Sequence, residues 1–292
     1  MGAVGGSEEA GRTTRLALDL GYRHIDTAAA YGNEEAVGKV IRESNIPRDQ
    51  IYVVTKLPEA AHGNVVEGFN ASLAALGLDY VDLYLMHWPM AHDPATKRVL
   101  QPEESPTFVE TWLEMEKLLQ TGKVRTIGVS NFSVKTLEIL LPHVKVVPAV
   151  NQIEMNPCLP NDEVFEYCKK KGIAVTAYTP MGRPDAPFYT SPIFLSISEK
   201  YNAAVGQILL SWSVQRGAVP IPKSSNPERA KQNITLVKLA SEDMAQIDLF
   251  HKQEGMHRTL CHRKRVEGTT ALFGWTFEQL GWNLGEGGVA LE

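Results

Sequence analysis

The sequence has few cysteines, no long apolar run and no excess of positive charge. Its three cysteines show no CxxC spacing, so neither a zinc site nor a disulfide framework is expected, and we predict reduced thiols in a cytoplasmic protein. No apolar run approaches the roughly 20 residues that cross a bilayer, so no membrane association is expected. A net charge of −5 across 292 residues argues against nucleic acid as a partner.

Several signatures are also missing. No G-x-G-x-x-G follows a predicted strand, which removes support for a Rossmann nucleotide site. No H-x-H pair ends a strand, which argues against a metal hydrolase, and no metal is expected. No low-complexity linker divides the chain. We therefore expect one domain over residues 1–292, with 253–292 as a C-terminal loop or tail, and we expect a monomer.

Short apolar runs rich in β-formers alternate with helical patterns along the chain. The runs show little polar alternation, as is typical of strands buried on both faces. Alternating strands and helices predict a parallel sheet in an α/β fold, and this many units favour a (β/α)8 TIM-type barrel, here with seven core strands. The seven predicted strands are Tyr22–Ile25, Ile51–Thr55, Val81–Met86, Val124–Val129, Val146–Ile153, Ile173–Tyr178 and Ala218–Ile221.

Polar residues with N-cap preference mark several helix starts. Ser7 precedes two glutamates and predicts the first helix. Ser105 predicts another, with Pro106 at the first helical position. Ser133 and Asn161 precede two more helical segments.

Polar side chains also follow three consecutive predicted strands. Asp26 ends the first, Lys56 follows the second and His87 follows the third, while Tyr31 lies in the loop after Asp26. Active sites of (β/α) barrels lie at the carboxyl ends of the strands. Four such groups on one rim therefore predict a catalytic site.

The chemistry that these residue types suggest is proton donation. A tyrosine titrates near pH 10, which is too high for an efficient acid at neutral pH. The ammonium of Lys56 is expected to lower the pKa of Tyr31, and Asp26 to hold Lys56 in place. His87 can donate a hydrogen bond to a substrate carbonyl and orient it.

Sequence motifs over about residues 7 to 252 resemble those of the aldo-keto reductase superfamily, in the same order. This resemblance implies a catalytic tetrad of Asp26, Tyr31, Lys56 and His87. It also implies hydride transfer from NADPH to a small carbonyl substrate, with Tyr31 as the proton donor. The motifs are Gly21–Ala28, Tyr31–Glu34, Thr55–Lys56, Leu85–Pro89, Ile127–Phe132, Asn151–Glu154 and Ile221–Ser224.

The same resemblance implies further contacts with NADPH/NADP+ and with the substrate. Tyr31, His87 and Trp88 are expected to contact the substrate. The expected cofactor contacts are Asp26, Ser130, Asn131 and Gln152 near the nicotinamide, Tyr178 stacked on its ring, Lys223, Ser224, Asn226 and Arg229 at the adenosine phosphate, and Gln232 and Asn233 at the adenine edge.

The expected phosphate site also has a physical rationale. Asn226 and Pro227 can start a short helix, whose N-terminus favours an anion. Lys223 and Arg229 add two cations, and an arginine fork suits a phosphate. This combination predicts a preference for NADPH over NADH.

The chain departs from the family pattern at both ends. The usual N-terminal hairpin and first barrel strand are absent before the first helix, and we expect Met1 to be an internal start. The C-terminal stretch contains four aromatic residues, and the resemblance implies a loop over the barrel mouth. The run His262–Arg265 is expected to be a solvated turn.

Three functional interpretations remain open. The first is an NADPH-dependent carbonyl reductase. The second is a non-catalytic NADPH-binding or cofactor-sensing protein on the same scaffold, which the missing strand favours. The third is a Schiff-base aldolase that uses Lys56, which leaves the segment Lys223–Asn233 unexplained.

Overall fold

The computed structural model describes residues 2, 6–261 and 268–291. Within these residues, seven strands form one sheet in chain order. The pairs β1–β2, β2–β3, β3–β4 and β6–β7 run parallel. The predicted α/β class with seven core strands is confirmed. The strands are β1 (His24–Asp26), β2 (Tyr52–Leu57), β3 (Val81–Met86), β4 (Val124–Ser130), β5 (Val150–Glu154), β6 (Ala174–Tyr178) and β7 (Val219–Pro220).

Helices alternate with these strands along the chain. None of the helices in the described residues is long and apolar enough to cross a membrane. The helices are α1 (Gly6–Asp19), α2 (Glu34–Glu43), α3 (Val65–Leu76), α4 (Phe108–Leu118), α5 (Val134–Leu140), α6 (Asp162–Lys170), α7 (Pro192–Lys200), α8 (Val205–Gln215), α9 (Pro227–Ile234), α10 (Ser241–Asp248) and α11 (Phe277–Leu280).

The packing divides the chain into two compact units. The first comprises Met1–Asn151 and Lys223–Ala230, and the second comprises Gln152–Pro222 and Lys231–Glu292. Strands β1–β4 and helices α1–α5 belong to the first unit, whereas β6, β7, α6–α8, α10 and α11 belong to the second. The expectation of a single domain stays a prediction.

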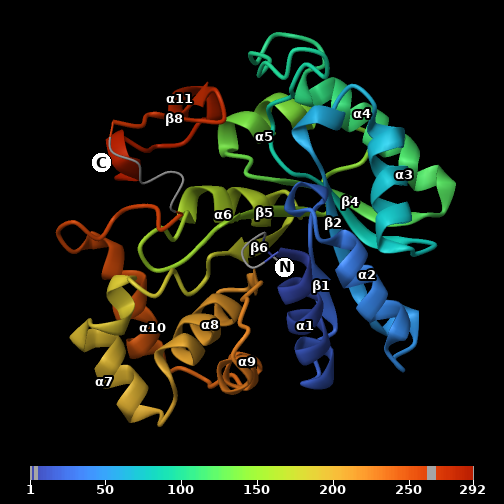
Figure 1. Cartoon of the computed structure of the whole chain (residues 1–292). Helices are drawn as coiled ribbons and strands as arrows, with labels where there is room; N and C mark the ends of the chain where they lie inside the picture. Colours follow the sequence, from blue (N-terminus) through green and yellow to red (C-terminus); the bar gives the residue numbers. More distant parts are fainter. Residues whose placement is uncertain (1, 3–5, 262–267, 292) are drawn as a thin grey trace. The chain divides into compact units, whose positions relative to one another are not determined.

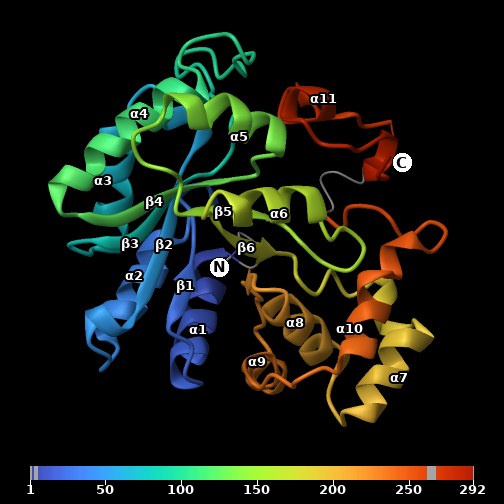
Figure 2. The same ribbon diagram turned by 180° about the vertical axis from the view of Figure 1, so that it is seen from behind.

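In the first unit, the helices pack in chain order outside the strands. Figures 1 and 2 show α2, α3 and α4 along the outer side of β1–β4. Every residue of β3 is buried, and Val54, Leu83 and Leu85 form part of the core. The α2–α3 contact requires a glycine, because a Cβ on Gly38 would lie 1.9 Å from the backbone oxygen of Leu76.

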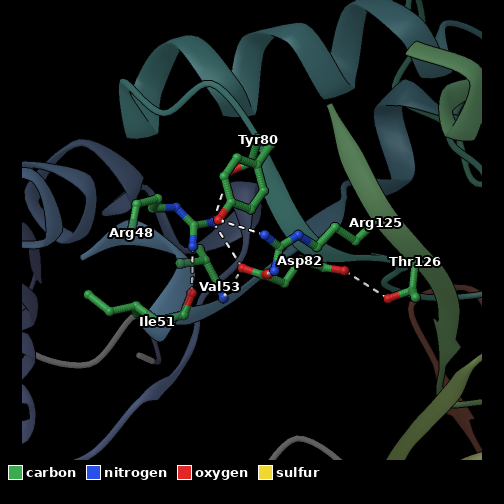
Figure 3. Close-up of polar contacts among 7 residues, drawn as sticks. All are labelled: Arg48, Ile51, Val53, Tyr80, Asp82, Arg125 and Thr126. Carbon is green, nitrogen blue, oxygen red and sulfur yellow. Dashed lines mark hydrogen bonds and ion pairs between the residues drawn. The ribbon is translucent and has the colours of Figure 1, made fainter. Parts of the chain in front are cut away.

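A charged cluster closes the amino-terminal end of these strands (Figure 3). The buried carboxylate of Asp82 accepts hydrogen bonds from Arg48 Nη2 at 2.9 Å, from Arg125 Nη1 at 2.8 Å and from the Val53 amide at 2.9 Å. Both guanidinium groups lie against the Tyr80 ring, at 4.0 Å for Arg48 and 4.5 Å for Arg125. The cluster therefore joins β2, β3 and β4 at the end where each strand begins.

Two predicted helix starts are each wrong by two residues. Helix α1 begins at Gly6, and the Ser7 hydroxyl donates to the Gly32 carbonyl instead of capping the helix. Helix α4 is capped by Thr107, not Ser105, because Thr107 and Glu110 form a reciprocal capping box. The predicted cap at Ser133 is confirmed.

Strand β5 begins four residues later than the predicted Val146. The amides of Lys145 and Val146 donate to the Glu116 carboxylate, at 2.7 and 2.8 Å, and Trp112 donates to the Val146 carbonyl. These bonds tie the segment to α4. Pro148 then lacks the amide that a sheet ladder would need.

Two of the four C-terminal aromatics lie in regular structure, Trp275 in β9 and Phe277 in α11. Strands β8 (Ala271–Leu272) and β9 (Trp275–Thr276) form an antiparallel pair that leads into α11. Trp275 and Phe277 are buried, and both belong to the second unit. Its placement over the barrel mouth stays a prediction, and the run His262–Arg265 lies outside the described residues.

Candidate active site

An ion pair lies at the carboxyl ends of the first two strands. Asp26 is the last residue of β1, and Lys56 lies one residue before the end of β2. Lys56 Nζ donates to Asp26 Oδ1 at 2.6 Å and to the Thr27 carbonyl at 2.7 Å, and the lysine side chain is 0% exposed. A buried charge is tolerated only when it is paired and hydrogen-bonded, so both bonds fix the ammonium in one position.

Tyr31 and His87 complete a cluster around this ammonium. Tyr31 ends the short 3-10 helix η1 (Ala29–Tyr31), which Gly32 terminates in the left-handed conformation. Lys56 Nζ lies 5.2 Å from the centroid of the Tyr31 ring. His87 directly follows β3, and its ring lies edge-on to Tyr31, with centroids 5.7 Å apart. The structure therefore brings together the four residues that the strand ends and the first loop predict.

The pKa of Tyr31 is raised, whereas the sequence analysis expects it to be lowered. Burial raises the pKa of the phenol, and the charge of Lys56 and its hydrogen bond lower it only in part. Burial also opposes the charged form of Lys56, yet Asp26 and Tyr31 beside it leave the lysine pKa raised. The two groups are therefore a neutral phenol and a charged ammonium at neutral pH. The expected lowering of the Tyr31 pKa fails because burial outweighs the ammonium.

Three further predicted residues lie next to His87 in the same unit. The Trp88 ring is 6.1 Å from the His87 ring. Ser130 is the last residue of β4, and Asn131 follows it with a φ of 66°. Asn131 Nδ2 donates to the His87 carbonyl at 2.9 Å and to Ser130 Oγ at 3.0 Å. This left-handed turn therefore fixes Ser130 and Asn131 to the backbone of His87.

The predicted phosphate-binding segment also belongs to the first unit. Asn226 Oδ1 accepts from the Arg229 amide at 2.9 Å, which caps the start of α9 as predicted. Ser224 Oγ bonds to the backbone of Asn226. Lys223 and Arg229 are exposed at this helix start. The segment thus presents two cations, a hydroxyl and a helix N-terminus, a donor set that suits an anion.

Sequence reasoning missed an acidic neighbour of this segment. Hydrogen bonds from Arg12 and Ser225 lower the pKa of the Glu9 carboxyl, and the charge of Lys223 adds to this effect. Glu9 lies in α1, far from Lys223 in the sequence. No local pattern indicates that Glu9 lies near this segment.

The remaining predicted cofactor residues belong to the second unit. Gln152 lies in β5 and is buried, and Tyr178 ends β6. Gln232 is exposed and Asn233 is buried, both in the last turns of α9. Their contacts with a cofactor stay predictions.

Comparison with known proteins identifies the family. The model of the aldo/keto reductase family matches residues 5–252. The chain belongs to the aldo/keto reductase family. It is 44% identical over 268 residues to a glycerol 2-dehydrogenase (NADP(+)) of Saccharomyces cerevisiae, covering 86% of each chain. It is 42% identical to an aldehyde reductase of the same yeast, covering 84% of this chain and 83% of the relative.

Solved structures of family members have the same fold. The Bombyx mori aldo-keto reductase in complex with NADP superimposes with a TM-score of 0.77 at 38% identity, covering 85% of this chain and 84% of that one. An aldo-keto reductase from a deep-sea metagenome library gives 0.76 at 39% identity, covering 86% and 88%. The resemblance and the fold class that the sequence predicts for this aldo-keto reductase are confirmed.

Proposed function

We propose that this aldo-keto reductase reduces an aldehyde or ketone to an alcohol with NADPH, and that Tyr31 is the proton donor. The observation that carries the proposal is the buried Lys56–Asp26 pair beside the Tyr31 ring, 5.2 Å from Lys56 Nζ to the ring centroid. The names of the relatives agree with this chemistry, since they include an NADP(+)-dependent glycerol dehydrogenase and an aldehyde reductase.

The residues at two places fit NADPH. The exposed cations and the helix start at Lys223–Arg229 suit the adenosine phosphate. The Ser130–Asn131 turn, bonded to the His87 carbonyl, offers hydroxyl and amide groups that suit a carboxamide. Gln152, Tyr178, Gln232 and Asn233 are proposed as further cofactor contacts. When bound, NADPH supplies a hydride to the carbonyl carbon of the substrate.

The residues of the chain supply the proton and the orientation. His87 donates a hydrogen bond to the substrate oxygen and directs it toward Tyr31. The O–H bond of Tyr31 breaks as its proton passes to that oxygen, and the phenolate then recovers a proton from water. Lys56 stabilises this phenolate, because an ammonium in a buried site acts more strongly than in water. Asp26 keeps Lys56 charged, and Trp88 lines the substrate side of His87.

The direction of the Tyr31 pKa is compatible with this role. A general acid must carry its proton before the reaction, and burial raises the phenol pKa. The contribution of Lys56 is to lower the energy of the phenolate that forms. Loss of the proton above the ordinary value of about 10 then limits reduction only in strong alkali, so the rate is expected to be nearly constant from about pH 6 to 9.

The direct test is NADPH oxidation with a panel of aldehydes and ketones, followed by the absorbance of the reduced nicotinamide. Tyr31→Phe is expected to lower kcat by roughly 10²–10⁴-fold, because the ring stays and only the acid is lost. Tyr52→Phe is the matched control, because Tyr52 begins β2 at the opposite end and is 38% exposed. An unchanged rate for Tyr31→Phe would refute the proposal.

The coenzyme preference has its own test. Arg229→Ala is expected to raise KM for NADPH more than KM for NADH, because the lost guanidinium contacts only the extra phosphate. Lys231→Ala, an exposed cation in the same helix, is the matched control. Equal changes for both coenzymes would remove the phosphate contact from the proposal.

Two alternative functions can be distinguished from carbonyl reduction. NADPH binding without turnover of any carbonyl would favour a non-catalytic cofactor-binding protein. A Schiff-base aldolase needs a neutral lysine, whereas the buried pairing with Asp26 leaves the pKa of Lys56 raised. A cytoplasmic location and a monomeric state remain predictions.

A further inference from the structure

Two buried polar residues directly follow the loop that carries Tyr31. Asn33 is 1% exposed and Glu34 is 7% exposed, whereas the next residue, Glu35, is exposed. Neither Asn33 nor Glu34 contacts the substrate in the proposed mechanism. Burial of an amide and a carboxylate costs free energy unless each is hydrogen-bonded, so their partners matter.

Asn33 does not act as its position suggests. It is the N-cap residue of α2, where asparagine normally accepts a hydrogen bond from an amide in the first turn of the helix. Here the side chain makes no cap bond. Its Oδ1 instead accepts from Thr27 Oγ1 at 2.7 Å. The Asn33 side chain is therefore bonded to the residue that follows β1 and does not cap α2.

Glu34 makes the corresponding link to β2. Its Oε1 accepts a hydrogen bond from the hydroxyl of Thr55. Thr27 and Thr55 are both fully buried. A hydroxyl donating to a buried carboxylate is a strong, directional hydrogen bond. The second link is thus as firmly placed as the first.

Each of the two threonines is adjacent in the sequence to one residue of the buried Asp26–Lys56 ion pair. Thr27 directly follows Asp26, and its carbonyl accepts from Lys56 Nζ at 2.7 Å. Thr55 directly precedes Lys56. The residues that follow Tyr31 and Gly32 are therefore bound to both strands at the positions that hold the ammonium.

We infer that Asn33 and Glu34 are positioning residues, whose bonds to Thr27 and Thr55 set the distance between the Tyr31 phenol and the Lys56 ammonium. This inference rests on the proposed role of Tyr31 as the acid. Electrostatic stabilisation of a phenolate depends steeply on that distance in a buried site. A small displacement of the loop would weaken this stabilisation of the phenolate without moving the Ser130–Asn131 turn or the Lys223–Arg229 segment.

The test removes each hydroxyl without changing side-chain shape. Thr27→Val and Thr55→Val delete one bond each, and Thr27→Ser and Thr55→Ser keep the hydroxyl and serve as rescue variants. Glu35→Gln is the control, because it changes an exposed carboxylate in the first turn of the same helix. For each protein we would measure kcat, KM for NADPH and the pH profile of kcat for alcohol oxidation.

Both valine variants are expected to lower kcat by about tenfold or more, since small misplacements of reacting groups have large effects on rate. KM for NADPH should stay within about twofold, because the proposed phosphate and carboxamide contacts at Lys223–Arg229 and Ser130–Asn131 are unchanged. Alcohol oxidation requires the phenolate, so its rate rises as Tyr31 loses its proton. A weaker field from Lys56 should move that inflection to higher pH, a change that mere loosening of the fold would not cause. The serine variants should restore kcat and the inflection.

Wild-type kcat and an unchanged inflection in both valine variants would overturn the inference. So would a loss of kcat that the serine variants share equally. Tyr31→Phe separates this failure from failure of the proposed function. If Tyr31→Phe is inactive while the valine variants behave as wild type, only the positioning role is wrong; if Tyr31→Phe is active, the acid itself is misassigned.

Discussion

Two buried aspartates lie at opposite ends of the same group of strands, and their cationic partners differ in exposure. At the carboxyl end, Asp26 pairs with Lys56, whose side chain is 0% exposed. At the amino end, Asp82 pairs with Arg48 and Arg125, whose side chains are 22% and 53% exposed (Figure 3). Water reaches the cations of the second cluster and screens them. A fully buried cation instead acts strongly on whatever charge forms beside it.

The tyrosines at the two ends differ in the same way. Tyr80 lies against two guanidinium groups, 4.0 and 4.5 Å from its ring centroid, in a cluster that joins strands. Tyr31 lies beside a single buried ammonium and faces the His87 ring. From this comparison we infer that the charges at the amino end stabilise the fold and that those at the carboxyl end serve catalysis. This division is typical of the two ends of barrel strands.

The largest effect is expected from the buried cation. Lys56→Met should lower kcat by about 10³-fold, because the phenolate loses the charge that stabilises it. Single-turnover NADPH oxidation measures this loss independently of product release. Arg125→Met, which removes a cation at the other end, is the control and should leave kcat unchanged. Similar losses in both variants would break the comparison.

The next effect concerns stability alone. Asp82→Ala should lower the free energy of unfolding by about 2–3 kcal/mol, because Arg48, Arg125 and the Val53 amide all lose their acceptor. Urea unfolding measures this change. The activity per folded molecule should be unchanged, and a large loss of kcat in the folded fraction would contradict the assigned role.

Acid should weaken the fold near the carboxyl end of β2. Burial lowers the pKa of His62 to about 3, from an ordinary value of 6.5, and His92 adds to this shift. The Thr111 hydroxyl lies 3.0 Å from the Thr107 carbonyl oxygen and forms a 3.2 Å hydrogen bond with Nδ1 of His62, whose direction depends on the imidazole tautomer. The folded state therefore keeps a neutral ring.

The sign of the pH dependence follows from this depressed pKa. The unfolded chain binds a proton at His62 below pH 6.5 and the folded chain does not, so stability is complete above 6.5 and falls toward pH 3. At pH 5 the loss should be about 2 kcal/mol. His62→Gln should flatten the pH dependence of urea unfolding, while Asp82→Asn should keep its slope; an unchanged slope in His62→Gln would contradict the account.

The smallest effect distinguishes the two arginines. Arg125→Ala should cost at most about 1 kcal/mol, because an exposed ion pair contributes little. Arg48→Ala should cost more, since Arg48 is less exposed and also donates to the Tyr80 carbonyl at 2.9 Å. Thermal unfolding of both variants ranks them, and the reverse order would show that exposure does not decide the contribution.

Much of this could be predicted from the sequence, because strand ends are local features. Asp26, Lys56 and His87 each follow an apolar run, and parallel strands bring such ends to one edge. The caps at Ser133 and Asn226 were predictable for the same reason, since a cap depends on neighbours three residues away.

What could not be predicted depends on burial or on distant partners. Asn33 resembles a helix cap, and its diversion to Thr27 depends on how the loop folds back on β1. Glu34 bonds to Thr55, which is 21 residues away. The direction of the Tyr31 pKa fails for a related reason, because the charge of Lys56 is visible in the sequence but the burial that outweighs it is not.

The most direct test of the central claim is the same substitution at both ends, Asp26→Asn and Asp82→Asn, with kcat measured per folded molecule. If chemistry resides at the carboxyl end, Asp26→Asn lowers kcat by about 10²-fold, because the ammonium loses its counter-ion and shifts its pKa. Asp82→Asn then lowers only the unfolding temperature. Wild-type kcat in Asp26→Asn, or an equal loss in both variants, would contradict the account.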